Sequence, residues 1–144
     1  MGIFSQYIWR GWEFSKDSVV IQPSVTVGYK GFSLNLWGNF DTDQYDIGKA
    51  KWNETDITIS CNMTLGPIEL GAGYIYYAMT EYKDTQEFYL SVGADTILSL
   101  TFTVYRDTTS LSTWYLNLRI SHSFSLPKKN EPGSAGIGRI LHLK

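Results

Sequence analysis

The stretch GYKGFSLNLWGNF, residues 28–40, decides the fold, because apolar and polar side chains alternate along it. The even-numbered Phe32 and Leu34 are apolar, whereas the odd-numbered Ser33 and Asn35 are polar. Residues that are all even-numbered or all odd-numbered within a strand share one parity. A period of two places successive side chains on opposite faces of a β-strand. One face of this strand is therefore apolar, and that face must lie against a protein core, a bound lipid or a membrane.

The same period of two continues through most of the chain and predicts an all-β protein. Along residues 98–106, for example, Leu100 and Phe102 alternate with Thr101 and Thr103. Several strands run about ten residues, the length that crosses a bilayer at a tilt near 45°, whereas strands of globular sheets usually have about five or six. The alternation predicts eight strands, at residues 4–12, 19–29, 32–40, 55–65, 68–78, 87–95, 98–106 and 113–124.

The connections between these strands alternate between tight turns and long links. Longer polar links follow the odd-numbered strands, and the longest is the acidic stretch 41–56. In an up-and-down sheet all tight turns then lie at one end, as in outer-membrane barrels with their short periplasmic turns and long extracellular loops. The turn-forming residues after the second, fourth and sixth strands are Gly31, Gly66, Pro67 and Asp95.

Composition narrows the partners and the class of membrane protein. The net charge is −2 and no basic run occurs, so we expect no nucleic-acid partner. No apolar run reaches the roughly 18 residues of a transmembrane helix, which argues against a helical membrane protein but leaves a membrane barrel open. The N-terminus has neither a basic region nor an apolar core typical of a signal peptide, so we expect that peptide to be absent from this chain.

The apolar parity is expected to face lipid, with aromatic residues near the strand ends. Tyr and Trp favour a bilayer interface because they combine an apolar ring with a polar group, although aromatic residues are also common in β-strands generally. The predicted lipid-facing residues are Val25, Leu36, Ile59, Leu70, Leu90, Phe102 and Leu118. The predicted interface aromatics are Tyr29, Phe32, Phe88, Trp114 and Phe124.

Charged and amide residues on the opposite parity would face the lumen of a barrel. A charge in a narrow interior must be paired or hydrated. In an eight-stranded barrel, whose interior fits side chains or one small ligand, we expect an ion-pair network that plugs the lumen. In a larger barrel the same residues would line a water-filled pore for a small solute or ion. The predicted lumen-facing residues are Arg10, Glu69, Glu87, Arg119, Asn35, Asn62 and Asn117.

Two stretches carry a family resemblance: SQYIWRGWEFSKDSVVIQPSVTVGYKGFSLNLWGNF at residues 5–40 and GAGYIYY at residues 71–77. The matching positions are Tyr7, Trp9, Arg10, Gly11 and Pro23. In these features the chain resembles a porin-like group of uncharacterised bacterial outer-membrane proteins, labelled TorF or Gcw_chp, over roughly residues 5–125. The resemblance implies an outer-membrane β-barrel with no established substrate. Members of that group usually have more strands. Outer-membrane barrels in general usually carry a terminal strand that ends in an aromatic residue, and RILHLK does not match such a strand.

The sequence offers no catalytic constellation, so we expect no enzyme, no cofactor and no metal. His122 falls on the lipid-facing parity, and neither it nor His142 has a plausible buried partner for a Ser-His-Asp set. No Cys and His cluster has metal-ligand spacing. The carboxylates of residues 41–56 make calcium binding conceivable, but their spacing fits no EF-hand and a solvated loop is favoured.

Together these features predict an antiparallel up-and-down transmembrane β-barrel of about eight strands, alone or within a larger barrel, in a bacterial outer membrane. Residues 1–126 would form the barrel and residues 127–144 a flexible tail. We expect a porin-like channel or a structural membrane protein whose partners are membrane lipids or detergent; the sequence leaves its oligomeric state open. The alternative is a soluble β-barrel whose apolar parity encloses a lipid or another hydrophobic ligand.

Overall fold

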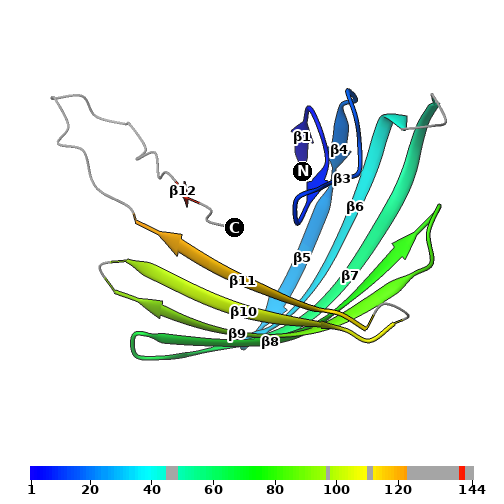
Figure 1. Ribbon diagram of the computed structural model, residues 1–144. Helices are drawn as coiled ribbons and strands as arrows, with labels where there is room; N and C mark the ends of the chain where they lie inside the picture. Colours follow the sequence, from blue (N-terminus) through cyan, green and yellow to red (C-terminus); the bar gives the residue numbers. More distant parts are fainter. Residues whose placement is uncertain (45–48, 97, 110–111, 123–139, 142–144) are drawn as a thin grey trace, which may run out of the picture.

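The computed structural model describes residues 1–44, 49–96, 98–109, 112–122 and 140–141, which form a strongly curved antiparallel sheet and a small hairpin (Figure 1). The prediction of an all-β antiparallel fold is confirmed. Across these ranges, no helix has the length and hydrophobicity that crossing a membrane requires.

Twelve strands lie in the described part of the chain. The long sheet has the order β1-β4-β6-β7-β8-β9-β10-β11-β12, with β5 also paired to β6, whereas β2 and β3 pair only with each other. The strands are β1 Gly2–Phe4, β2 Ile8–Trp9, β3 Trp12–Glu13, β4 Val20–Gln22, β5 Ser24–Tyr29, β6 Phe32–Gln44, β7 Lys49–Leu65, β8 Ile68–Met79, β9 Thr85–Asp95, β10 Ser99–Asp107, β11 Trp114–Ser121 and β12 Ile140–Leu141.

β4 and β5 together form one path that is interrupted at Pro23. β4 pairs with β6 through Val20 and Asp41. β5 pairs with the same strand through Ser24 and Trp37. Proline has no N–H to donate to a ladder, so the strand breaks at this point. The sheet therefore has seven long paths, β4/β5 and β6 to β11, each antiparallel to the next.

The prediction of one strand over residues 4–12 is wrong. Arg10 and Gly11 have positive φ angles of 49° and 87°. They turn the chain back on itself so that Trp9 pairs with Trp12. Two successive residues at positive φ are typical of a type I′ hairpin turn. This segment therefore forms the hairpin β2–β3 and does not supply an eighth strand to the wall of the sheet.

The stretch 41–56, predicted to be a solvated loop, is mostly strand. β6 continues to Gln44 and β7 begins at Lys49. The β6–β7 ladder shifts register between Asn39 and Phe40 and again before Gln44. Bulges of this kind bend a strand and interrupt its strict alternation, which is why the sequence pattern did not reveal the extension.

The sheet curves strongly but does not close into a barrel (Figure 1). Among the described strands, β5 pairs with β6 alone, and β11 pairs with β12 only through Ile120 and Ser121. Because consecutive paths are antiparallel, β5 and β11 run in the same direction. Joining these two edges requires one further strand that is antiparallel to both, which is the direction of β12. The expected tail, residues 127–144, lies outside the described residues except for β12.

The two faces of the sheet reverse the usual order of a soluble domain, in which buried side chains are mainly apolar. On the convex face large apolar side chains are exposed, among them Val25, Leu36 and Leu118. On the concave face polar side chains are buried, among them Asn39 and Glu87. The buried apolar side chains of the described residues are Tyr7, Val20 and Tyr77.

Two tight turns allow a matched test of backbone geometry. Gly31 and Gly66 have φ of +88° and +59°, and a Cβ on Gly31 would lie 2.6 Å from the Asn62 carbonyl oxygen, whereas a Cβ on Gly66 would meet nothing within 4 Å. We expect Gly66→Ala to lower the free energy of unfolding by about 1–2 kcal/mol, the cost of a positive φ for a residue with a Cβ. Gly31→Ala should lower it further, because the added Cβ also crowds the Asn62 carbonyl oxygen. Urea titration of the folded protein measures both, and equal losses would contradict the crowding at Gly31.

Candidate functional site

The N-terminal hairpin, which we define as residues 7–15, lies on the concave side of the sheet (Figure 1). Backbone contacts close its base: the Phe14 amide donates to the Tyr7 carbonyl oxygen at 2.8 Å. The Tyr7 amide in turn donates to Ser15 Oγ at 2.5 Å, and Ser15 is almost fully buried. These bonds fix the two arms of the hairpin to each other independently of their contacts with the sheet.

Aromatic rings attach the N-terminal hairpin to the sheet. The Tyr7 ring lies 5.7 Å from the ring of Trp37 on β6. The Trp9 ring meets Tyr77 of β8 edge-on at 6.0 Å. Phe14 lies between the two anchors, 5.5 Å from Tyr7 and 5.9 Å from Trp9. These separations are typical of favourable aromatic pairs, so the hairpin is packed against the concave face and does not project from it.

Arg10, at the tip of the N-terminal hairpin, forms a bidentate ion pair with Glu87 of β9. The distances Nη1–Oε1 and Nη2–Oε2 are both 2.7 Å, and only 14% of the Arg10 side chain and 5% of the Glu87 side chain are exposed. The Tyr77 hydroxyl donates a further hydrogen bond to Glu87 Oε2 at 2.9 Å. Two parallel charge-assisted hydrogen bonds are among the strongest side-chain contacts in proteins. Here they join residues 77 positions apart.

Three aromatic rings surround the Arg10 guanidinium. Its central carbon lies 4.3 Å from the ring centroid of Trp9, 4.6 Å from that of Tyr105 and 4.1 Å from that of Tyr115. Each ring face attracts the cation, and the attraction strengthens where water is excluded. Through Glu87, Tyr105 and Tyr115, Arg10 contacts β9, β10 and β11 and holds the hairpin across three neighbouring strands.

Glu69 and Arg119, also predicted to face a lumen, lie apart from the Arg10 pair. Both are exposed. Neither belongs to the ion pairs formed within the described residues, which join Arg10 to Glu87 and Lys51 to Glu81. Glu69 lies near the start of β8, beside the Gly66–Pro67 turn, and Arg119 lies near the end of β11. On the concave face of the described sheet, one buried ion pair therefore replaces the expected network.

The three amides predicted to face a lumen have different environments. Asn35 donates to Ser24 Oγ at 2.9 Å and to Thr26 Oγ1 at 2.7 Å. Asn62 is exposed, and its backbone amide donates to the Gly31 carbonyl oxygen at 2.8 Å. Asn117 is half-buried. None of the three contacts Arg10 or Glu87 through a hydrogen bond within the described chain, so they do not extend the buried ion pair.

A second buried polar group, Glu54 and Asp56 of β7 beside Tyr7, was missed from the sequence. Only 5% of Glu54 is exposed, and Asp56 Oδ1 is buried with no hydrogen-bond donor among the described residues. Burial, and then the nearby Glu54 carboxylate, raises the pKa of the Tyr7 phenol above its ordinary value. The sequence could have revealed this group, because Glu54, Asp56 and Thr58 alternate with their neighbours and so share the polar face of one strand.

The predicted lipid-facing residues all have exposed side chains on the convex face: Val25, Leu36, Ile59, Leu70, Leu90, Phe102 and Leu118. The predicted interface aromatics Tyr29, Phe32, Phe88 and Trp114 are exposed on the same face. Phe124 lies outside the described residues. The convex face therefore gathers one continuous set of apolar side chains from β5 to β11.

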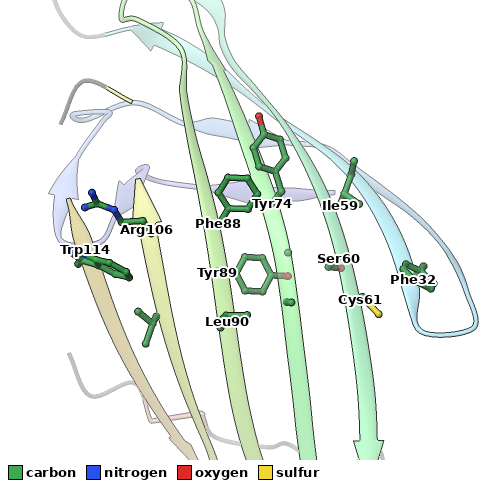
Figure 2. A pocket seen from close by; sticks show the side chains of 13 residues that line it. Phe32, Ile59, Ser60, Cys61, Tyr74, Phe88, Tyr89, Leu90, Arg106 and Trp114 are labelled. Atoms are coloured by element: carbon green, nitrogen blue, oxygen red, sulfur yellow. The ribbon is translucent and has the colours of Figure 1, made fainter. Parts of the chain in front are cut away.

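An apolar hollow of about 530 Å³, which we name the convex trough, crosses this face (Figure 2). The small side chains of Cys61 and Ala72 lie along it, and the larger rings of Tyr74 and Phe88 border it. Arg106 lies at one end, beside Trp114 (Figure 2). Arg106 follows Val104 by two positions in β10 and therefore lies on the same, apolar face of the strand. The sequence alone thus places a charged residue at the border of this face.

Within the described ranges, no three His, Cys, Asp or Glu side chains are placed to hold a metal ion. The concave contacts are ion pairs, hydrogen bonds and ring packing, which hold structure together. Comparisons with known protein families, with curated proteins and with solved structures find no match to this chain. The family resemblance therefore remains a prediction from the sequence.

Proposed function

We propose that this chain is an integral protein of a bacterial outer membrane and that the paths β4/β5 to β11 form part of the wall of a transmembrane β-barrel. The observation that carries the proposal is the exposed apolar convex face, which includes Val25, Leu36 and Leu118. Soluble monomers rarely expose a contiguous apolar patch of more than a few hundred Å². Lipid tails would remove these apolar side chains from contact with water, which is favourable. The exposed face therefore supports a membrane location.

The strand lengths also support membrane insertion. β8, β9 and β10 contain 12, 11 and 9 residues. At about 3.3 Å per residue and a tilt of about 40°, such strands reach about 23–30 Å along the membrane normal. The lipid-facing apolar band of an outer-membrane barrel is about 25 Å tall. The wall of the sheet therefore has the height that this location requires.

The open edges of β5 and β11 are a further reason to expect a closed barrel in the membrane. A bilayer offers no water to satisfy unpaired N–H and C=O groups, so open sheet edges do not occur in its hydrocarbon region. Since β5 and β11 run in the same direction, one antiparallel strand between them would complete an eight-stranded wall. β12 already pairs with β11 in that direction at Ile120 and Ser121, which favours a closing strand on this edge.

The N-terminal hairpin favours a plugged barrel over an open pore. Its tip is held by the Arg10–Glu87 pair and by rings from β10 and β11. An eight-stranded interior is only wide enough for side chains or one small ligand. We therefore propose a porin-like or structural membrane protein whose lumen is occupied by its own N-terminal segment.

The alternative of a soluble barrel around a hydrophobic ligand receives less support. That function needs the apolar parity to point inward around a cavity. Here the apolar parity is convex, and the concave face buries Glu54, Glu87 and Asp107 instead. A hydrophobic ligand on the concave side would therefore lie against polar and charged groups where that function requires apolar ones.

Refolding into detergent micelles tests the membrane proposal. We expect the unboiled protein to migrate differently from the boiled protein on a semi-native gel, because a closed barrel resists unfolding by the detergent of the gel. The circular dichroism spectrum of the same sample should be rich in β-structure. Cooperative folding to a monomer in plain buffer, with no need for detergent or lipid, would contradict the proposal.

A further inference from the structure

Arg106 is the exception on an otherwise uncharged surface. The convex side chains of β8–β11 are those of the even-numbered residues, as the exposed Leu70, Leu90, Phe102 and Leu118 illustrate. Among those even-numbered residues, Arg106 alone is charged. It lies one residue before the end of β10, on the side of the long links. A cation placed there would meet the headgroup level of a membrane that covers the convex face.

Neutral groups hold the Arg106 side chain in place. Its guanidinium lies 4.9 Å from the ring centroid of Trp114. Its Nη2 donates to Ser112 Oγ at 2.6 Å, and its Nη1 donates to the Ser112 carbonyl oxygen. No carboxylate in the described part of the chain forms an ion pair with it. The positive charge is therefore positioned but not neutralised, and a guanidinium suits a phosphate because its N–H groups match two oxygens at once.

The convex trough extends from Arg106 across the strands. Strand pairing places Phe32 opposite Cys61, Cys61 opposite Ala72, Ala72 opposite Leu90 and Leu90 opposite Val104. Phe32 begins β6 beside a tight turn, whereas Arg106 lies near the opposite, long-link end of β10. The trough thus runs obliquely from one end of the strands to the other. Figure 2 shows Arg106 and Trp114 on one side of it and Phe32 with Cys61 on the other.

We propose that the convex trough binds one acyl chain of an anionic phospholipid whose phosphate is held by Arg106. This inference rests on the proposed membrane location and names a specific lipid contact within it. The trough volume of about 530 Å³ falls within the roughly 300–1,000 Å³ of ordinary small-molecule sites. Its apolar lining suits an acyl chain, and the one unpaired cation at its end selects a negative headgroup over a neutral one.

Native mass spectrometry tests this lipid selectivity. The refolded protein is released from micelles that contain equal amounts of phosphatidylglycerol and phosphatidylcholine with the same acyl chains. Both lipids carry the phosphate, but the choline cation of phosphatidylcholine offsets its negative charge and repels the Arg106 guanidinium. We therefore expect a one-to-one adduct in which phosphatidylglycerol exceeds phosphatidylcholine several-fold. Arg106→Gln should abolish this preference while the heat-modifiable gel band remains, because the replacement lies on the surface.

Two further variants separate the headgroup contact from the chain contact. Arg119→Gln makes the same replacement on the neighbouring strand, on the odd-numbered face, and should leave the preference unchanged. Ala72→Phe fills the middle of the trough with an apolar ring and should weaken binding of both lipids several-fold although Arg106 remains. Soluble glycerol phosphate at the same concentration should not displace the lipid, because it has no chain to occupy the trough.

The possible outcomes test the lipid site and the membrane location separately. A protein that inserts and shows the heat-dependent gel shift, yet binds both lipids equally, would overturn the lipid site and leave the membrane location intact. Equal losses of preference in Arg106→Gln and Arg119→Gln would also overturn the site, since a general charge effect would then explain the binding. A protein that folds in neither micelles nor vesicles would overturn both.

Discussion

Leu36→Arg is expected to lower the free energy of unfolding in lipid vesicles by about 2–4 kcal/mol. Leu36 lies on β6 between Val25 and Ile57, and its side chain is 46% exposed on the convex face. If lipid covers this face, the replacement moves a cation to the middle of the hydrocarbon. If water covers it, the same replacement at a half-exposed site should change stability by no more than about 0.5 kcal/mol.

Leu65→Arg is the matched control for this measurement. Leu65 is the last residue of β7, beside the Gly66–Pro67 turn, and its side chain is 54% exposed. Residue type and exposure are thus comparable, but the depth in a membrane differs. We expect a loss of only about 0–1 kcal/mol, the value for cations near the bilayer interface. Guanidinium titrations of both variants in the same vesicles measure the difference, and equal small losses would rule out lipid contact at Leu36.

Strict alternation allowed the faces of the sheet to be predicted from the sequence alone. A period of two assigns each side chain to one side of a strand without knowledge of the strand's neighbours. The residues from Val25 to Leu118 that were predicted to share an apolar face therefore share one in the structure. The tight turns at Gly31 and Gly66 were predictable for a similar local reason, because glycine adopts positive φ readily.

The N-terminal hairpin could not be predicted in the same way. Its turn places Arg10 at a φ of 49°, a conformation that is uncommon for residues other than glycine, asparagine and aspartate. The aromatic residues on either side of the turn, Trp9 and Trp12, read equally well as one strand. Only contact with the concave face explains why the chain turns here, and that contact depends on residues far away in the sequence.

For the concave site, the sequence likewise predicted which face a residue lies on but not which residues contact one another. Parity predicted that Arg10 and Glu87 would both face inward, but their pairing over 77 positions depends on how the hairpin folds back. Glu54 and Asp56 were placed in the acidic stretch 41–56 because β7 carries an extra residue, Asn53, between the pairs Asn39–Glu54 and Phe40–Trp52, and this residue breaks the alternation of β7 itself. Whether the two edges of the sheet can be joined also depends on the whole chain, since the direction of β5 relative to β11 follows from the number of strands between them.

Arg10→Met is expected to lower the free energy of unfolding by about 3–5 kcal/mol, the cost of leaving one partner of a buried ion pair alone. Glu87 would keep the Tyr77 hydrogen bond but lose both guanidinium contacts, with only 5% of its side chain exposed. Lys51→Met is the control, because it breaks the Lys51–Glu81 pair, whose side chains are 32% and 41% exposed. Exposed pairs contribute about 0–1 kcal/mol, so this control should change little.

The double variant Arg10→Met with Glu87→Gln identifies buried charge as the cause. The glutamine amide oxygen can still accept from the Tyr77 hydroxyl, while no net charge remains beside it. Replacement of a whole buried ion pair is often neutral or even stabilising, so most of the loss caused by Arg10→Met should be recovered. Guanidinium titrations in vesicles measure the free energy of unfolding of the unchanged protein, Arg10→Met, Lys51→Met and the double variant. A double variant no more stable than Arg10→Met would show instead that the lost ring contacts of Arg10 with Trp9, Tyr105 and Tyr115, and not the stranded carboxylate, account for the effect.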